Sequence, residues 1–353
     1  MNGESIMNDV NAKIKKLPER LYKWDNIKFF LILCVVLGHF SSVVLEKSAA
    51  IDTVFLYTLS FHMPLFIFIS GLFTKSYQDK PLNGNKIFGL LTICLLYKLL
   101  LLLVNIYYEN ETISVSVFSD ISAPWYLFVL VIFMGITYLV RNIRPAYVLG
   151  FAIVLSLISG YDAEIGRHMS LSRIIVFFPY FYAGYILEPE KVAKALDKLW
   201  LKIIAIIGLI AVAVYVYLSS SAILYYRGLG TGLASYRAIE VLVNNGETVG
   251  MTQRLITYVV AVIMSIFIIS LIPNIRIPFI SDMGTRTLQV YVLHRPILLI
   301  MQYEGTLPWI RNHVSNSHWD FYWLLTGVVL TLLLSFKFIE IPFKKLMDNK
   351  MKA

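Results

Sequence analysis

The sequence predicts an all-α polytopic membrane protein, a helical bundle of about ten transmembrane helices, and three observations support this class. Hydrophobic residues make up 58% of the chain, charged residues 15%, and the mean hydropathy is +0.70, which lies outside the range of ordinary soluble domains. Apolar segments recur along the whole chain, most of them near the roughly 17 to 25 residues that a helix needs to cross a bilayer. Lysine and arginine gather between alternate segments, as topology signals do.

The first predicted span follows a polar, basic leader. It lacks a small-residue cleavage site near its end, so we expect it to stay in the protein rather than to be removed as a signal peptide. The predicted spans cover approximately 29–45, 53–74, 87–107, 125–140, 146–160, 173–187, 201–219, 255–272, 285–302 and 320–340.

Three regions make up the predicted organisation of the chain. They are a basic cytoplasmic leader over 1–28, one integral membrane domain over 29–340 and a cytoplasmic tail over 341–353. The chain shows no internal repeat and no interrupted short span, so nothing favours a transporter built from duplicated bundles.

The positive charges predict the orientation of the chain. The presumed inner segments hold 22 lysine and arginine residues, whereas the presumed outer segments hold seven. Because cytoplasmic loops carry the excess of basic residues, we expect both termini in the cytoplasm and the protein in the cell membrane. An even number of spans follows from this arrangement.

Charge and cysteine content argue against other classes of protein. The net charge of +9 is spread between apolar segments instead of forming one basic stripe, so we expect no nucleic-acid partner. Cys34 and Cys94 both lie inside apolar segments, where a free cysteine behaves as a small hydrophobic residue. We therefore expect neither a disulfide framework nor a bound metal, and the lipids of the membrane are the predicted surroundings.

The stretch WDNIKFFLILCVVLGHF, residues 24–40, places an ionisable side chain inside the first span. His39 lies eleven residues after Lys28, a rise of about 16 Å, which puts the imidazole near the middle of the bilayer. Eleven residues are almost three full turns, so Lys28, Asp25 and His39 share one face of the helix. A cation at the inner mouth and a base at mid-depth would line one track.

Other spans carry polar side chains at similar depth. A polar group in hydrocarbon is costly, so each should face the protein interior or water, and we expect these groups to converge with His39. Each one also has a packing interpretation, because polar side chains hold membrane helices together, and Ser70 and Gly71 suit a close helix contact. Tyrosine and phenylalanine stripes are interpreted as core filling. The candidate residues are His62, Lys98, His294 and Arg295.

Four stretches in this order resemble the membrane acyltransferase-3 family, specifically its fucose-4-O-acetylase-like branch: WDNIKFFLILCVVLGHF, FHMPLFIFISGLF, PWYLFVLVIF and LQVYVLHRPIL. The family has a basic residue followed eleven positions later by a histidine essential for acyl transfer, which here are Lys28 and His39. The family's usual arginine is replaced by lysine, which keeps the charge but loses the fork suited to phosphate. A pair of arginines found in the family after the second span is missing, and Lys86 alone stands there.

The resemblance implies transfer of an acetyl or other acyl group from cytoplasmic acyl-CoA to a hydroxyl of a cell-surface or lipid-linked glycan. His39 would be the general base, since a neutral imidazole can take the proton of a sugar hydroxyl. Arg295, His62 or Lys98 would stabilise the oxyanion, with His294 beside them. The phosphates of acetyl-CoA would meet Lys28, Lys86 and Lys23.

The longest outer segment, about 220–254, is the candidate for binding the acceptor, although a lid or a packing role is open for it. The residues assigned to acceptor binding are Trp125, Arg173, Tyr226 and Arg227. Two rival functions remain from the residues alone: a non-enzymatic translocator of lipid-linked sugars, with the same polar groups lining a pathway, and a polymerase of surface polysaccharide.

Overall fold

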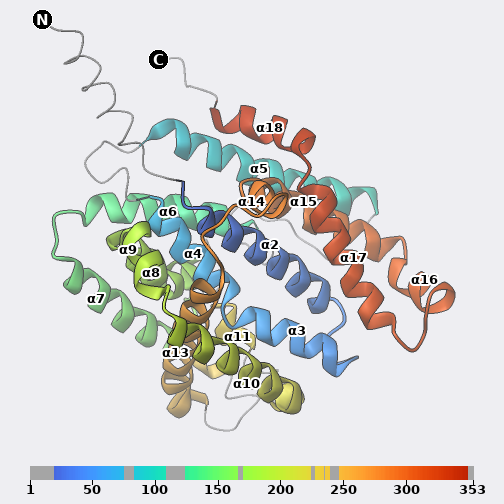
Figure 1. Ribbon diagram of the computed structural model, residues 1–353, viewed down its shortest axis with the longest axis horizontal. Coiled ribbons are helices and arrows are strands. Elements are labelled where there is room, and N and C mark those ends of the chain that lie inside the picture. Colours follow the sequence, from blue (N-terminus) through green and yellow to red (C-terminus); the bar gives the residue numbers. More distant parts are fainter. Residues whose placement is uncertain are drawn as a thin grey trace, which may run out of the picture.

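The structure is a computed structural model that describes residues 20–74, 83–108, 124–165, 170–223, 227–233, 235–238 and 246–348. Within these ranges every regular element is helical, which confirms the all-α class (Figure 1). The principal helices are α2 (Tyr22–Ser42), α3 (Ala49–Leu59), α4 (His62–Leu72), α5 (Gly84–Tyr107), α6 (Trp125–Leu139), α7 (Pro145–Ile158), α8 (Leu171–Ile186), α10 (Leu199–Ile223), α13 (Gly246–Leu271), α15 (Thr287–Tyr303) and α17 (Trp319–Leu334). The shorter ones are the 3-10 helix η2 (Ser159–Tyr161), α9 (Pro189–Leu196), α11 (Arg227–Gly230), α14 (Ile280–Gly284), α16 (Thr306–His313) and α18 (Lys337–Asp348).

Every predicted span overlaps one of the principal helices, and the second overlaps both α3 and α4. Five helical segments are long and apolar enough to cross a membrane, with α3 and α4 taken together, and the pair α17 and α18 makes six if it forms one bent span. Three further apolar helices, α6, α7 and α8, are shorter. The structure thus supports a helical membrane protein, while the count of about ten spans stays a prediction.

The expectation of uninterrupted spans is wrong at two places. The second span is broken at residues 60 and 61, between α3 and α4. Pro64 explains this break, because proline lacks the N–H that would bond to the carbonyl of Ser60 and is tolerated only in the first turn of a helix. The last span is bent by 62° between α17 and α18. The first break matters for the site, since His62 becomes the first residue of α4.

Helices α4 and α8 make a close backbone contact. A Cβ added to Gly71 would lie 2.0 Å from the carbonyl oxygen of Phe181, and a Cβ added to Gly184 would lie 2.0 Å from that of Phe68. Only glycine fits at either position, so the two backbones approach each other reciprocally, as small residues permit in membrane helices. This finding confirms the close helix contact that Ser70 and Gly71 predicted.

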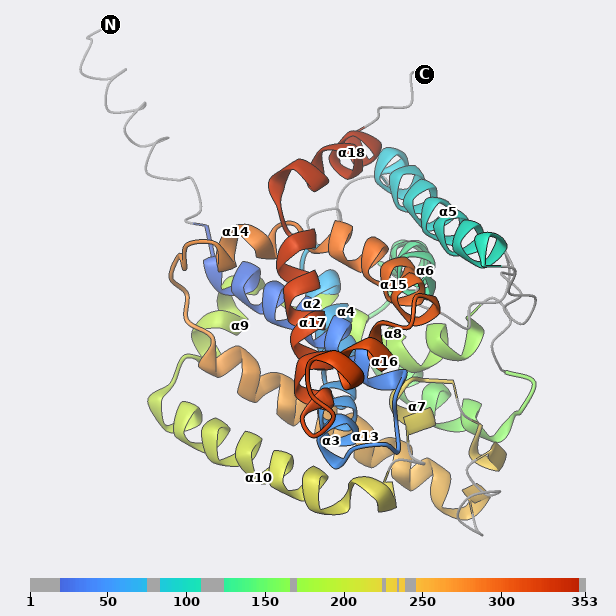
Figure 2. The same ribbon diagram turned by 90° about the vertical axis from the view of Figure 1, so that its right-hand side faces the viewer.

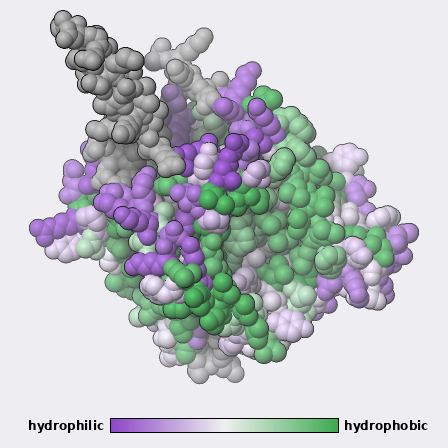
Figure 3. Space-filling view, in the orientation of Figure 1, coloured by the Kyte–Doolittle hydropathy of each residue, from purple (hydrophilic) through white to green (hydrophobic). Residues whose placement is uncertain are grey.

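Hydrophobic residues cover the middle of the molecule's surface. Figure 3 shows them gathered across one face, with hydrophilic residues toward opposite edges. Helices α5 and α10 lie at the periphery (Figure 2) and expose side chains such as Leu103 and Ile207, which are 52% and 63% exposed. Lipid is the natural cover for such surfaces. The predictions for residues 1–19 and 349–353 lie outside the described residues.

Candidate active site

Two of the predicted histidines meet in the interior. The ring centroids of His39 on α2 and His294 on α15 are 5.1 Å apart, with the ring planes tilted by 41°. His294 is fully buried, whereas His39 is partly accessible. The two helices pack against each other, so residues 255 positions apart in the sequence form one pair.

The hydrogen bonds of the histidines distinguish their roles. The Nδ1 atom of His62 lies 2.6 Å from the carbonyl oxygen of Thr58, and that of His294 lies 3.0 Å from the carbonyl oxygen of Val290. A ring nitrogen facing a carbonyl must donate, so in the neutral state both residues carry the proton on Nδ1 and keep Nε2 as an acceptor. Among the described residues, His39 shows no hydrogen bond from its ring to the protein. Its imidazole is therefore available to a substrate.

Charged and ionisable groups lie close enough to His39 to act on it. Its imidazole interacts electrostatically with His294, Arg295, His62 and Arg173. These residues come from α15, α4 and α8, so four helices contribute to one interior site around His39. Lys98, the remaining predicted member, is half-buried on α5.

Trp125 and Arg173, predicted separately for acceptor binding, lie together in the structure. The guanidinium carbon of Arg173 lies 4.6 Å from the centroid of the Trp125 ring, a cation–π contact. Trp125 also stacks on Phe177, with the ring centroids 5.2 Å apart. The Nε atom of Arg173 donates to the carbonyl oxygen of Thr231 at 3.4 Å. Arg173 thus connects the segment after α11 to the charge environment of His39.

One residue near the histidines was missed by the sequence analysis. Tyr97 on α5 is fully buried, and its ring packs edge-to-face on Tyr291 with centroids 5.5 Å apart. Tyr291 lies one turn before His294, and the two rings are 6.2 Å apart. The charge of Arg295 also acts on Tyr97. Its neighbour Lys98 attracted attention in the sequence because of its charge, and a buried hydroxyl gave no comparable signal.

The N-terminal end of α2 forms a compact ion cluster. Asp25 accepts from Arg20 through one carboxylate oxygen at 2.8 Å and from Lys28 through the other at 2.8 Å. The hydrogen bonds and charge of Asp25 raise the pKa of the Arg20 guanidinium above its ordinary value. The Lys28 ammonium also lies 5.9 Å from the ring centroid of Phe73 and keeps 26% of its side chain exposed. Lys28 is thus held in place and accessible.

The other two lysines predicted to meet the donor occupy different surroundings. Lys23 is 1% exposed, and its ammonium donates to the carbonyl oxygen of Ile269 at 2.5 Å. This contact joins α2 to the end of α13 and gives Lys23 a structural role. Lys86 is half-buried in the first turn of α5, where its backbone N–H is capped by the side chain of Asn83 at 3.2 Å.

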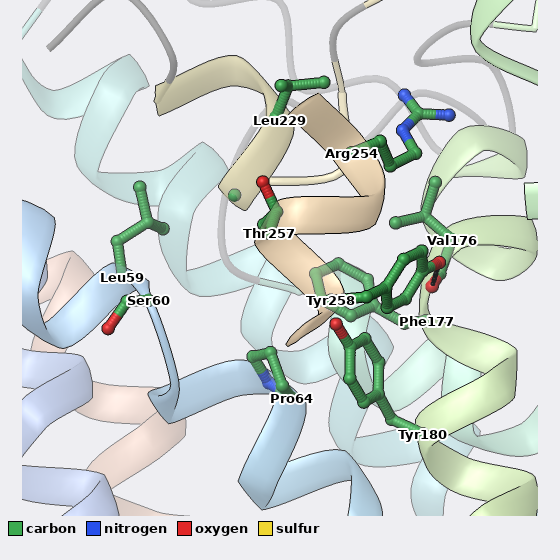
Figure 4. A pocket seen from close by; sticks show the side chains of 11 residues that line it. Leu59, Ser60, Pro64, Val176, Phe177, Tyr180, Leu229, Arg254, Thr257 and Tyr258 are labelled. Carbon is green, nitrogen blue, oxygen red and sulfur yellow. Dashed lines mark hydrogen bonds between the residues drawn. The ribbon is translucent and has the colours of Figure 1, made fainter. Parts of the chain in front are cut away.

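A small pocket, partly open to solvent, lies beside the break between α3 and α4. Figure 4 shows Leu59, Ser60 and Pro64 on one side of it and Tyr180 and Tyr258 on the other. Phe177, which stacks on Trp125, also lines it. The pocket therefore adjoins both the aromatic contact of Arg173 and the helix that begins with His62.

The pocket contains an arginine that the sequence analysis did not select. Arg254 on α13 is 2% exposed; its Nη1 atom donates to the carbonyl oxygen of Ser156 at 2.8 Å. Its guanidinium lies over the Tyr236 ring at 4.8 Å. The predicted Arg227, by contrast, is exposed and lies 4.0 Å from the carboxylate of Glu46. Tyr226 lies outside the described residues.

In the part of the chain that the structure describes, no group of three or more histidine, cysteine or acidic side chains could hold a metal ion.

The family model described as an acyltransferase domain, acyltransferase family 3, matches residues 21–339. The same comparisons find no matching curated protein and no matching solved structure. The matched range includes His39, His62, His294 and Arg295. The chain therefore belongs to the acyltransferase-3 family of membrane acyltransferases.

Proposed function

We propose that the protein is an O-acyltransferase that moves an acetyl group from cytoplasmic acetyl-CoA to a hydroxyl of a cell-surface or lipid-linked glycan. The proposal follows the sequence resemblance to the fucose-4-O-acetylase-like branch of the family. It places the enzyme in the cell membrane with both termini in the cytoplasm, as the distribution of 22 inner and seven outer basic residues favours.

One observation carries the proposal: a partly accessible imidazole with no protein hydrogen bond lies beside a second, fully buried imidazole in an interior that also holds Arg295. A base that must accept a substrate proton needs an unoccupied nitrogen, and His39 meets that requirement. His62 and His294 each use one nitrogen to hold a backbone carbonyl. They are better suited to shape the site than to exchange protons with a substrate.

The proposed reaction is one displacement at the thioester. His39 takes the proton of the acceptor hydroxyl while its oxygen attacks the thioester carbon, and the carbonyl electrons move onto oxygen. The tetrahedral intermediate then expels the CoA sulfur as the C–S bond breaks. The proton held by His39 passes to the leaving thiolate, which restores the neutral imidazole. Arg295 would stabilise the transient negative charge in this site of low dielectric constant.

The two substrates would approach from opposite ends of the site. Lys28 is the proposed contact for the CoA phosphates, because its ammonium is accessible at the predicted cytoplasmic end of α2. The acceptor glycan would enter from the pocket beside the α3–α4 break, where aromatic rings and the Ser60 and Thr257 hydroxyls suit a sugar. Arg173 and Trp125 line the route between that pocket and His39.

The direct test is release of free CoA from acetyl-CoA by the purified protein, with the membrane fraction of cells lacking the gene as the control. The acetyl content of surface glycan should fall when the gene is deleted and return when it is restored. The proposal is wrong if the purified protein neither releases nor exchanges CoA and if deletion of the gene leaves glycan acetylation unchanged. The protein would then be a carrier or a polymerase instead.

A further inference from the structure

Three polar atoms deep in the protein, on residues linked by ring contacts through Tyr291 or adjacent in the sequence, lack a protein hydrogen-bond partner. They are the hydroxyl of Tyr97, Nε2 of His294 and Nη1 of Arg295. Tyr97 and His294 both have 0% exposure. A buried polar group without a partner destabilises the folded state, so a group of them in one place calls for an explanation.

The contacts place these atoms around the candidate reaction centre. His294 lies 5.1 Å from His39 between ring centroids, and Arg295 is the next residue on α15. Arg295 is close enough to act electrostatically on both His39 and Tyr97. The edge-to-face contact with Tyr291 fixes the Tyr97 ring against the same helix.

The hydroxyl of Tyr97 has no structural use. Phenylalanine at this position would fill nearly the same volume without burying an oxygen. Tyr126 makes a useful contrast: its ring also packs on Tyr291, at 5.3 Å, but its hydroxyl bonds to the Ser70 hydroxyl at 2.7 Å. One tyrosine is a satisfied core residue, and the other offers an unused donor.

We infer that Tyr97 is a catalytic residue whose hydroxyl, together with the Arg295 guanidinium, binds the carbonyl oxygen of the acyl thioester and stabilises the oxyanion. This inference rests on the proposed acyl transfer. Both groups donate hydrogen bonds, so they suit an oxygen that only accepts, such as the carbonyl, better than a hydroxyl that must surrender its proton to His39. No proton leaves Tyr97 in the step; the O–H stays intact and its hydrogen bond strengthens as charge develops.

The test compares two single-atom changes with opposite expected results. Tyr97→Phe should lower kcat about 100-fold with the KM for acetyl-CoA within about twofold, because the donor acts mainly in the transition state. Its Tm should equal or exceed that of the wild type, because an unpartnered hydroxyl is removed. Tyr126→Phe should lower the Tm, since it loses a hydrogen bond, and should leave kcat within about twofold of the wild type.

Each other outcome has a definite meaning. Wild-type protein without acyl transfer refutes the proposed function and the inference with it. An active wild type whose Tyr97→Phe variant keeps its kcat refutes the inference alone and leaves His39 as the base. Lys98→Met tests the rival assignment on the adjacent residue, and a larger loss of kcat there than at Tyr97 also overturns the inference.

Discussion

The polar residues near the two ends of α2 differ in whether their side chains have partners in the protein. At the N-terminal end, Asp25 neutralises two cations, and the Asn26 amide nitrogen donates to the carbonyls of Pro273 and Ile275 at 3.2 and 3.0 Å. Toward the other end, His39 has no protein hydrogen bond from its ring, and its neighbour His294 keeps a buried nitrogen without a partner.

This difference distinguishes polar residues that stabilise the fold from polar residues that serve the reaction. Polar groups that satisfy one another stabilise the folded state by fixing α2 against the segment that follows α13. Groups that lack partners destabilise it until a ligand supplies them. The helix therefore predicts two kinds of variant, those that affect stability and those that affect turnover.

The largest effect is expected at the unsatisfied end. His39→Ala should lower the rate of acyl transfer about 10²- to 10⁴-fold, the usual contribution of a general base, while thermal unfolding stays close to that of the wild type. The measurement is CoA release at saturating acetyl-CoA. His313→Ala is the control, because that exposed histidine stacks on Trp309 away from the site and should keep the full rate. Retention of more than about a tenth of the rate by His39→Ala would make His39 a packing residue.

The satisfied end should show the reverse behaviour. Asn26→Ala removes two donated hydrogen bonds and one accepted from the Ser281 hydroxyl at 2.6 Å, so we expect a loss of about 2 to 4 kcal/mol in the free energy of unfolding. Activity per folded molecule should not change. Asn312→Ala, at an exposed position, provides the control for loss of an asparagine. A fall in turnover without a fall in stability would contradict the distinction between the two ends.

Lys28 lies at the boundary between these classes, because it is both paired and accessible. If its ammonium binds CoA phosphate, Lys28→Met should weaken donor affinity about ten- to a hundredfold, the contribution of a charge-assisted hydrogen bond. Lys28→Arg should keep or improve that affinity, since guanidinium matches phosphate geometry. The measurement is the affinity of each correctly inserted variant for acetyl-CoA. Lys191→Met is the control for loss of a positive charge on the predicted inner surface. Unchanged affinity would assign Lys28 to the ion cluster alone.

The smallest expected effect concerns topology: two introduced cysteines should give no labelling signal. Cysteines introduced as Ser5→Cys and Met351→Cys should remain unlabelled by an impermeant thiol reagent in intact cells, because the basic residues predict cytoplasmic termini. The native Cys34 and Cys94 are buried and should contribute no background. Asn312→Cys, on the predicted outer side, should be labelled as the positive control. Labelling of either terminal cysteine would reverse the assignment of the inner end of α2.

Hydropathy could predict the helices because an apolar run of about 20 residues is a local property of the chain. It missed the interruption at residues 60 and 61, since Pro64 inside an apolar run looks the same whether the helix bends or restarts. Charge identified His39 and Arg295 at once, because an ionisable group in hydrocarbon is conspicuous. It also drew attention to Lys98, while Tyr97 went unnoticed among the aromatic residues interpreted as core filling.

The contacts of the site could not be read from one sequence. Nothing in the order of residues shows that Arg173 lies over Trp125 or that His39 faces His294, because these contacts depend on how separate helices pack. The same holds for Arg254, which looks like an outer loop charge in the sequence and is buried in the structure. Position along each helix follows from residue number alone, whereas the contacts across helices do not.

The reciprocal glycine contact between α4 and α8 has a mechanical consequence. His62 begins α4 and Arg173 lies in the first turn of α8, so two helices whose backbones touch through Gly71 and Gly184 carry one ionisable group each. Helices in such close contact cannot slide past each other without a clash of backbone atoms. We expect the distance between that histidine and that guanidinium to stay constant through a catalytic cycle, so this pair forms the stationary wall of the site, and any movement that admits substrates belongs to the helices facing it.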